Sequence, residues 1–167
     1  MPRQSPHIRP MHPNDMTAIL AIQEACYALA MNESATVMQA RLARVPTYCW
    51  VATDADQVVA YLMAYPSRLG RVTPLGHDFS PAAEADCLYL HDLAVSPASG
   101  GRGIGRHLVR HALASGCWLA AGLVCVQDAL AFWLRQGFVP GYRLAPDQAE
   151  NLASYPTNPR YLVWQAV

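Results

Sequence analysis

Four glycines lie directly between a strand-like apolar segment and an amphipathic helical one. The stretch reads HDLAVSPASGGRGIG over residues 91–105, and the helical pattern RHLVRHAL follows it at once. The first turn of a helix carries unpaired N–H groups and about half a positive charge, so it binds phosphate. Glycine there lets a phosphate reach the backbone without a clash with Cβ. The pattern therefore predicts a phosphate-bearing ligand at residues 100–106.

Two common nucleotide-binding motifs do not fit this stretch. A P-loop needs a lysine after its second glycine, and the chain has no lysine at all. A dinucleotide-binding fingerprint needs the spacing Gly-x-Gly-x-x-Gly, whereas Gly101, Gly103 and Gly105 are each two residues apart and Arg106 stands at the third glycine position. A glycine-rich turn that only connects a strand to a helix stays open as a third interpretation.

Length and composition narrow the class of protein. The 167 residues suit a single domain, 1–167, that can bury a core. A formal net charge of zero gives no electrostatic attraction to nucleic acid or to an acidic membrane surface. The five cysteines form no Cys-x-x-Cys pair, so reduced thiols and no metal site are expected. Without a signal-like or membrane-spanning segment, a cytoplasmic protein is predicted.

Helical and strand patterns alternate along the chain. We expect strands at 7–11, 48–53, 57–65, 87–95, 122–126, 138–144 and 160–165, and helices at 16–26, 34–44, 103–115 and 128–136. The segment 66–86 is the one long irregular connection, and such loops are often functional. This order predicts an α/β (α+β) protein with a mixed central sheet of about seven strands and about four flanking helices.

Two segments resemble the GNAT N-acetyltransferase family. LYLHDLAVSPASGGRGIGRHLV resembles its acetyl-CoA-binding motif, in which Gln or Arg is followed after two residues by Gly-x-Gly or Gly-x-Ala. Gly103 and Gly105 take the two small positions, and Gly100 replaces the usual Gln or Arg. VQDALAFWLRQGF resembles the family's second motif. The resemblance covers nearly the whole chain and implies the GNAT-type acyl-CoA N-acyltransferase fold, with acetyl-CoA as cosubstrate and no metal.

The resemblance also implies where acetyl-CoA lies. Its pyrophosphate would bind the glycine-rich turn, and its pantetheine would follow a splay between the strands near Val95 and Val126. The backbone N–H of Leu93 or Ala94 would bind the oxygen that becomes negative. The implied cofactor-binding residues are Leu93, Ala94, Val95, Gly100, Gly101, Arg102, Gly103, Ile104, Gly105, Arg106, Asp128, Phe132 and Trp133.

His91 and Asp92 are the candidate bases. Direct attack on a thioester needs a neutral amine, so an ammonium must lose a proton, and a free imidazole titrates at about 6.5. Strand alternation places His91 and Asp92 on opposite faces unless a bulge intervenes. The segment LHDLAV resembles the base-bearing strand of the arylalkylamine N-acetyltransferases, with Tyr89 in place of their second histidine. A purely structural role for His91 and Asp92 also stays open.

The family's usual acid is missing. The tyrosine of the second motif aligns with Trp133, and an indole does not give up its proton near neutral pH. Solvent or Tyr142 would then protonate the leaving thiolate. The sequence thus predicts acetyl transfer to the primary amine of a small molecule. A non-catalytic acyl-CoA-binding or sensor protein, an acetyltransferase for protein N-termini or lysines, and a homodimer remain open.

Overall fold

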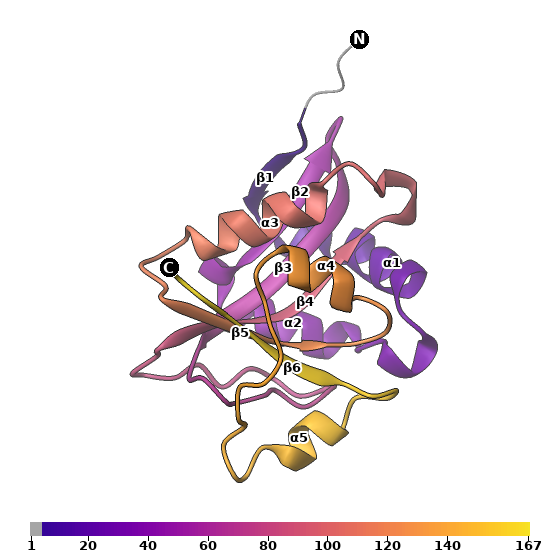
Figure 1. Cartoon of the computed structure of the whole chain (residues 1–167). Helices are drawn as coiled ribbons and strands as arrows, with labels where there is room; N and C mark the ends of the chain where they lie inside the picture. Colours follow the sequence, from indigo (N-terminus) through magenta and orange to yellow (C-terminus); the bar gives the residue numbers. More distant parts are fainter. Residues whose placement is uncertain (1–4) are drawn as a thin grey trace.

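The computed structural model describes residues 5–167 as one sheet with helices on both faces (Figure 1). The strands are β1 (His7–Pro10), β2 (Cys49–Asp54), β3 (Gln57–Ser67), β4 (Cys87–Val95), β5 (Ala120–Cys125) and β6 (Arg160–Gln165). The helices are α1 (Met16–Cys26), α2 (Ala35–Arg44), α3 (Ile104–Leu113), α4 (Leu130–Arg135) and α5 (Ala149–Ala153). The predicted mixed α/β class is confirmed.

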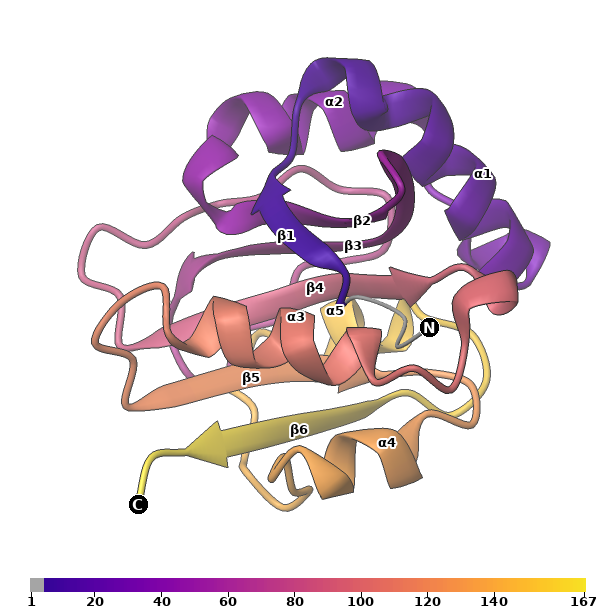
Figure 2. The same ribbon diagram turned by 90° about the horizontal axis from the view of Figure 1, so that it is seen from above.

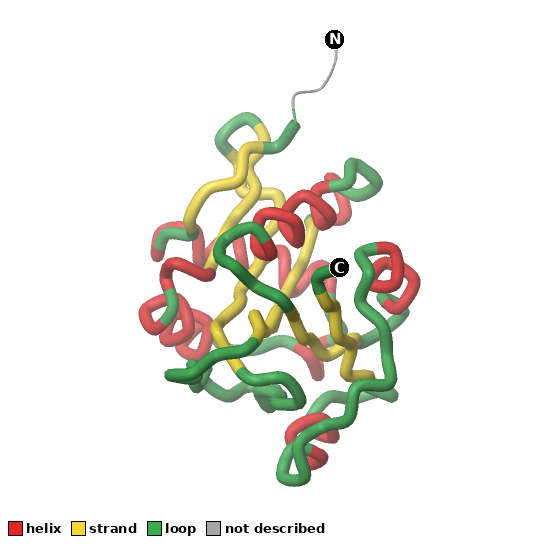
Figure 3. Tube along the Cα trace, turned by 60° about the vertical axis from the view of Figure 1, so that its left-hand side comes forward, coloured by secondary structure: helices red, strands yellow, loops and turns green. Residues whose placement is uncertain are grey.

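The six strands follow one another in the sheet in the order β1-β2-β3-β4-β5-β6. Every neighbouring pair is antiparallel except β4 and β5, which are parallel and are joined by a crossover through α3. Helices α1 and α2 cover one face, and α3 and α4 lie on the other (Figure 2). The tube view shows the same strands, in yellow, with helices on both sides (Figure 3).

Each face of the sheet has its own apolar core. Helix α1 buries Met16, Ile19 and Ile22 at helical spacing against the first face. Helix α3 buries Leu108 and Val109, among others, against the second. Within residues 5–167, none of the helices combines the length and apolar character needed to cross a membrane.

The C-terminal part differs from the sequence prediction. The strand expected at 138–144 is reduced to one bridge between Val139 and Val163. Pro140 offers no N–H to a strand ladder, and Gly141 turns the chain at a φ of 106°. Helix α5 forms within the segment expected to be a loop. Residues 5–167 therefore form six strands and five α-helices, where the sequence patterns indicated about seven strands and about four helices.

Candidate active site

Strand β4 has a β-bulge at the centre of the molecule. Asp92 pairs with Met63, and Leu90 pairs with the next residue of β3, Ala64. Two residues of β4 therefore advance against one of β3, and His91 is the extra residue. The bulge that the sequence left open is present.

The bulge brings both candidate bases to one face. His91 packs edge-on against Phe79 at 5.2 Å between ring centroids, in the core beneath α1 and α2. Asp92 accepts a hydrogen bond from Tyr61, which belongs to the same core. Leu93 packs with the core beneath α3. Simple alternation, which placed His91 and Asp92 on opposite faces, is therefore wrong beyond His91.

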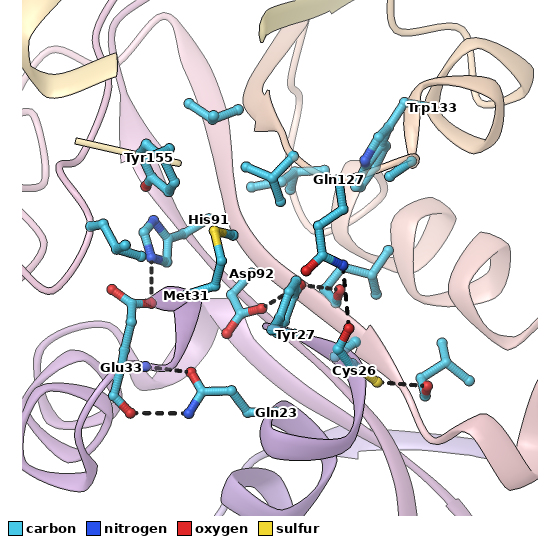
Figure 4. Close-up of a pocket in the computed structure, with 18 residues that line it drawn as sticks. Gln23, Cys26, Tyr27, Met31, Glu33, His91, Asp92, Gln127, Trp133 and Tyr155 are labelled. Carbon is cyan, nitrogen blue, oxygen red and sulfur yellow. Dashed lines mark hydrogen bonds and ion pairs between the residues drawn. The ribbon is translucent and has the colours of Figure 1, made fainter. Parts of the chain in front are cut away.

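Beyond the bulge, β4 and β5 separate. The two strands pair only through Leu88 with Ala121 and Tyr89 with Gly122, at the start of each strand. A cavity of about 220 Å³ lies where the strands have parted, and both strands line it (Figure 4). The backbone of β4 from 90 to 95 is one of its walls, so polar main-chain groups there can bond an extended ligand.

His91 lines this cavity and is held from one side. Its Nε2 lies 2.9 Å from Glu33 Oε1, and only 2% of its side chain is exposed. Its Nδ1 has no hydrogen-bond partner among residues 5–167. In Figure 4 the dashed line joins His91 to Glu33, and the opposite edge of the ring faces Tyr155. One ring nitrogen is therefore anchored, and the other is buried without a hydrogen-bond partner.

Arg41 fixes the charge of Glu33. The Arg41 guanidinium, which is fully buried, donates to both Glu33 oxygens at 2.7 and 2.5 Å and to the His77 carbonyl. Burial opposes ionisation of Glu33, but the hydrogen bonds from Arg41 and His91 and the positive charge of Arg41 hold its pKa well below the usual range. A carboxylate can only accept, so His91 donates from Nε2 and keeps a lone pair on Nδ1.

Asp92 is buried among hydroxyl groups. Tyr27, the residue that follows α1, lies 2.9 Å from Asp92 Oδ1, and Tyr61 donates to Oδ2 at 2.8 Å. Burial raises the pKa of Asp92 above the ordinary aspartate value, although His91 and the Tyr61 hydrogen bond oppose that shift. The pKa values of these two carboxyl groups are therefore shifted in opposite directions, upward for Asp92 and downward for Glu33.

A second, wider cavity lies at the glycine-rich turn. It measures about 720 Å³ and shares Leu93 and Val95 with the first cavity. Gly101 and Gly103 both have a φ of 73°, a conformation that glycine adopts without strain, and Gly103 is the N-cap of α3. Arg106 and Arg135 also line this cavity. The turn therefore fits a pyrophosphate, and it adjoins the cavity beside His91 at Leu93 and Val95.

The match to a known family agrees with this geometry. Residues 16–138 match the acetyltransferase (GNAT) family. The chain belongs to this family. No curated protein sequence matches it.

Solved structures of GNAT proteins share the fold along most of the chain. The GphF GNAT-like decarboxylase in complex with isobutyryl-CoA has a TM-score of 0.78 at 18% identity, covering 95% of this chain and 98% of that one. The ribosomal-protein-S18-alanine N-acetyltransferase from Escherichia coli has a TM-score of 0.69 at 16% identity, covering 96% of this chain and 94% of that one. A GNAT family acetyltransferase from Brucella melitensis in complex with acetyl-CoA has a TM-score of 0.59 at 24% identity, covering 81% of this chain and 83% of that one. At these identities the likeness establishes the fold.

Most residues expected to bind the GNAT cosubstrate line the two cavities. Leu93, Ala94, Val95 and Trp133 line the first. Residues 100–106 and Phe132 line the second. A Cβ on Gly105 would lie 3.2 Å from the Phe132 ring, so Gly105 lets α3 and α4 approach each other.

Two expected residues lie outside both cavities, and a third is bound to another side chain. Asp128 lies in a separate hollow beside Thr157 and Arg160. Tyr142 is 42% exposed, packs against Tyr161 and lines neither cavity. Arg102 does line the cavity at the turn, but it donates to Asp54 at 2.5 Å.

Sequence reasoning missed Glu33, Arg41 and Tyr27. Arg41 lies on the buried side of α2, beside Met38 and Leu42. A charged residue on an apolar stripe requires a buried partner, and that signal was available. Glu33 and Tyr27 flank a short 3-10 turn, and nothing in their local sequence places them beside β4.

Proposed function

We propose that this GNAT protein transfers the acetyl group of acetyl-CoA to the primary amine of a small molecule by direct attack. The observation that carries the proposal is the unpartnered Nδ1 of His91, a residue that lines the first cavity, together with a second cavity at the glycine-rich turn that shares Leu93 and Val95 with the first. Family membership and a relative whose structure contains acetyl-CoA support it. The arylalkylamine branch, to which LHDLAV is similar, is part of the same proposal.

The chain offers a defined place for each part of acetyl-CoA. The N–H groups of residues 101–106, with Arg106 and Arg135, would hold the pyrophosphate. The parted edge of β4 would bond the pantetheine. The N–H of Leu93 or Ala94 would donate to the thioester oxygen as negative charge develops there.

His91 would act as the general base. Its Nδ1 would accept a proton from the nitrogen, and the imidazolium so formed would be stabilised by the Glu33 carboxylate at 2.9 Å. Because Arg41 neutralises Glu33 in the resting protein, no net buried charge exists before the proton arrives. Orientation of the ring by Glu33 would also lower the entropic cost of reaching the reactive arrangement.

The walls of the first cavity favour a small, apolar amine. The cavity of about 220 Å³ must hold the thioester and the acceptor together. Met31, Leu75 and Tyr155 contribute apolar surface, and no arginine is among the residues that line it. An acceptor with a free carboxylate or phosphate would find no cation there. Its size also disfavours a protein segment, which is the acceptor class of the Escherichia coli relative.

A second candidate function is decarboxylation of a CoA thioester. In this cavity Glu33 is bound to Arg41 and Asp92 lies between two tyrosines, so no unpaired carboxylate is available to bind an ammonium. A reaction without an amine would not need one. The GphF protein, which shares this fold, is a GNAT-like decarboxylase by name.

One set of assays separates the candidates. Purified protein would be given acetyl-CoA with a panel of primary amines, and released thiol and acetylated product would be measured. Parallel reactions would contain malonyl-CoA without an amine, with carbon dioxide as the readout. We expect thiol and product in equal amounts with short aromatic or alkyl amines. Carbon dioxide without amine acetylation supports decarboxylation, and calorimetric acetyl-CoA binding without turnover supports a binding protein.

A further inference from the structure

The leaving thiolate needs a proton source that α4 does not supply. Trp133 stands where GNAT proteins usually have a tyrosine, and it is packed between Phe132 and Phe138. Two other polar residues, Tyr27 and Asp92, line the same cavity beside the separated strand β4. The hydrogen bonds around these two residues indicate whether the carboxyl group of Asp92 carries a proton.

The hydroxyl of Tyr27 has one proton and two neighbouring acceptors. Its oxygen lies 2.8 Å from the Leu93 carbonyl and 2.9 Å from Asp92 Oδ1. If Asp92 were ionised, the single proton of the Tyr27 hydroxyl would have to serve both contacts. In one of the two contacts, two oxygen atoms would then lie at hydrogen-bond distance with no hydrogen between them. If Oδ1 carries a proton, Asp92 donates to Tyr27 and Tyr27 donates to Leu93. The second oxygen of Asp92 still accepts from Tyr61. Every group is then satisfied.

We propose that Asp92 is a neutral carboxylic acid in the resting protein and that it supplies a proton, through the hydroxyl of Tyr27, to the thiolate of coenzyme A. In this scheme Tyr27 is the catalytic acid and Asp92 is the proton store behind it. The inference rests on the proposed acetyl transfer, since it assigns the acid of that reaction.

The protons balance over one turnover. The neutral amine bonds to the thioester carbon, the carbon–sulfur bond breaks, and the electron pair leaves on sulfur. His91 takes one proton from nitrogen. The thiolate takes the Tyr27 proton, and Tyr27 takes the proton of Asp92. The imidazolium then returns its proton to the Asp92 carboxylate through water, so His91 and Asp92 end as they began.

Asp92 makes this transfer energetically favourable. Burial raises the pKa of Tyr27 well above the ordinary tyrosine value, so alone it is a weaker acid than a thiol of pKa about 8.5. A carboxylic acid behind it replaces the lost proton at once. The charged or titratable groups that act on Asp92 come from each neighbouring element: Tyr27 after α1, Glu33 before α2, Tyr61 in β3 and His91 in β4.

Tyr27 and Tyr61 form a matched pair for the test. Each places a buried hydroxyl against Asp92, but only Tyr27 lines the cavity. In single-turnover acetyl transfer at neutral pH, we expect Tyr27→Phe to slow the chemical step at least about a hundredfold, the lower end of the range for general acid catalysis. Tyr61→Phe should stay within about threefold of wild type, because a neutral carboxyl keeps its proton without that donor. Equal rates for Tyr27→Phe and wild type, or equal slowing by both variants, would overturn the proposal.

A second measurement does not depend on turnover. Protein labelled with ¹³C at the aspartate carboxyl carbon would be observed by NMR at neutral pH, with Asp92→Asn identifying the signal. We expect the Asp92 signal at the position of a protonated carboxyl, whereas an ionised signal would overturn the proposal. If wild type acetylates no amine, the proposed function fails with the acid role, while the NMR signal still decides the protonation state.

Discussion

Replacing Asp92 by asparagine should make the folded protein more stable than wild type, by a margin that grows as pH rises. An asparagine side chain at this position can donate its amide to Tyr27 and accept from Tyr61, so it reproduces the hydrogen bonds of the neutral acid without a titrating proton. Near pH 4 or below, wild type and Asp92→Asn should differ by less than about 1 kcal/mol in the free energy of unfolding.

The sign follows from the direction of the pKa shift. The pKa of Asp92 is higher in the folded protein, mainly through burial, than in the unfolded chain, where it is about 3.9. The folded state therefore binds this proton more tightly, and wild type loses that stability as pH rises toward the folded pKa. Asp92→Asn has no titrating group at this position and keeps its stability. Its free energy of unfolding should therefore exceed that of wild type by about 1.4 kcal/mol more for each pH unit over which folded Asp92 stays protonated.

Urea unfolding between about pH 2 and pH 8 measures this difference. Asp15→Asn is a control of opposite sign, because Arg9 holds two hydrogen bonds to Asp15 at 2.8 Å and lowers its pKa. Asp15→Asn should be less stable than wild type at neutral pH, with the deficit shrinking as pH falls through the folded pKa of Asp15. If Asp92→Asn were less stable than wild type at neutral pH, the neutral-acid assignment would be refuted.

Three further predictions concern the cofactor turn, the buried ion pair and the missing acid. Gly103→Ala should weaken CoA binding measured by calorimetry, because alanine resists the φ of 73° at the N-cap of α3. Glu33→Gln should lower the free energy of unfolding by about 3–5 kcal/mol in urea, because it leaves the Arg41 charge buried and unpaired. Trp133→Tyr alone should leave the rate of single-turnover acetyl transfer at the wild-type value. Added to Tyr27→Phe, it should restore the rate that Tyr27→Phe loses.

Matched changes elsewhere separate these effects from general damage. Gly141→Ala meets a similar φ of 106° far from the turn, so CoA affinity should not fall. Asp78→Asn breaks the exposed pair with Arg44 and should cost no more than about 1 kcal/mol. CoA affinity lost equally in both glycine variants, or equal destabilisation by both carboxyl variants, would contradict the structural reasons given. No recovery of rate by the tyrosine at 133 would show that an acid at that position cannot reach the thiolate.

Local sequence patterns predicted the parts of the site that local chemistry determines. The strand at 87–95 and the glycine-rich turn were correct because alternating apolar residues and positive-φ glycines leave a direct signal. Gly100 stands where the family motif has Gln or Arg, and a cavity is nevertheless present at the turn, lined by Gly100 and residues 101–106. The strand at 138–144 failed because Pro140 outweighed the apolar residues around it.

Long-range contacts account for what the sequence could not show. Glu33 reaches His91 across 58 residues, and Tyr27 reaches Asp92 across 65. Neither pair has a local pattern, because the side chains meet only after α1 packs on the sheet. The bulge at His91 reverses the faces that simple alternation predicts, and register with β3 decides it. Local patterns therefore identified the glycine-rich turn and missed Tyr27, which we propose as the acid.

The most direct test is the rate of amine acetylation by His91→Gln. With acetyl-CoA and the best amine of the panel, product would be followed against pH by mass spectrometry, with His7→Gln on the exposed edge of β1 as the control. Loss of a general base predicts a fall of about 10²- to 10⁴-fold in kcat and disappearance of the acid limb, with CoA affinity retained. Wild-type turnover and pH dependence in His91→Gln would contradict acetyl transfer through His91.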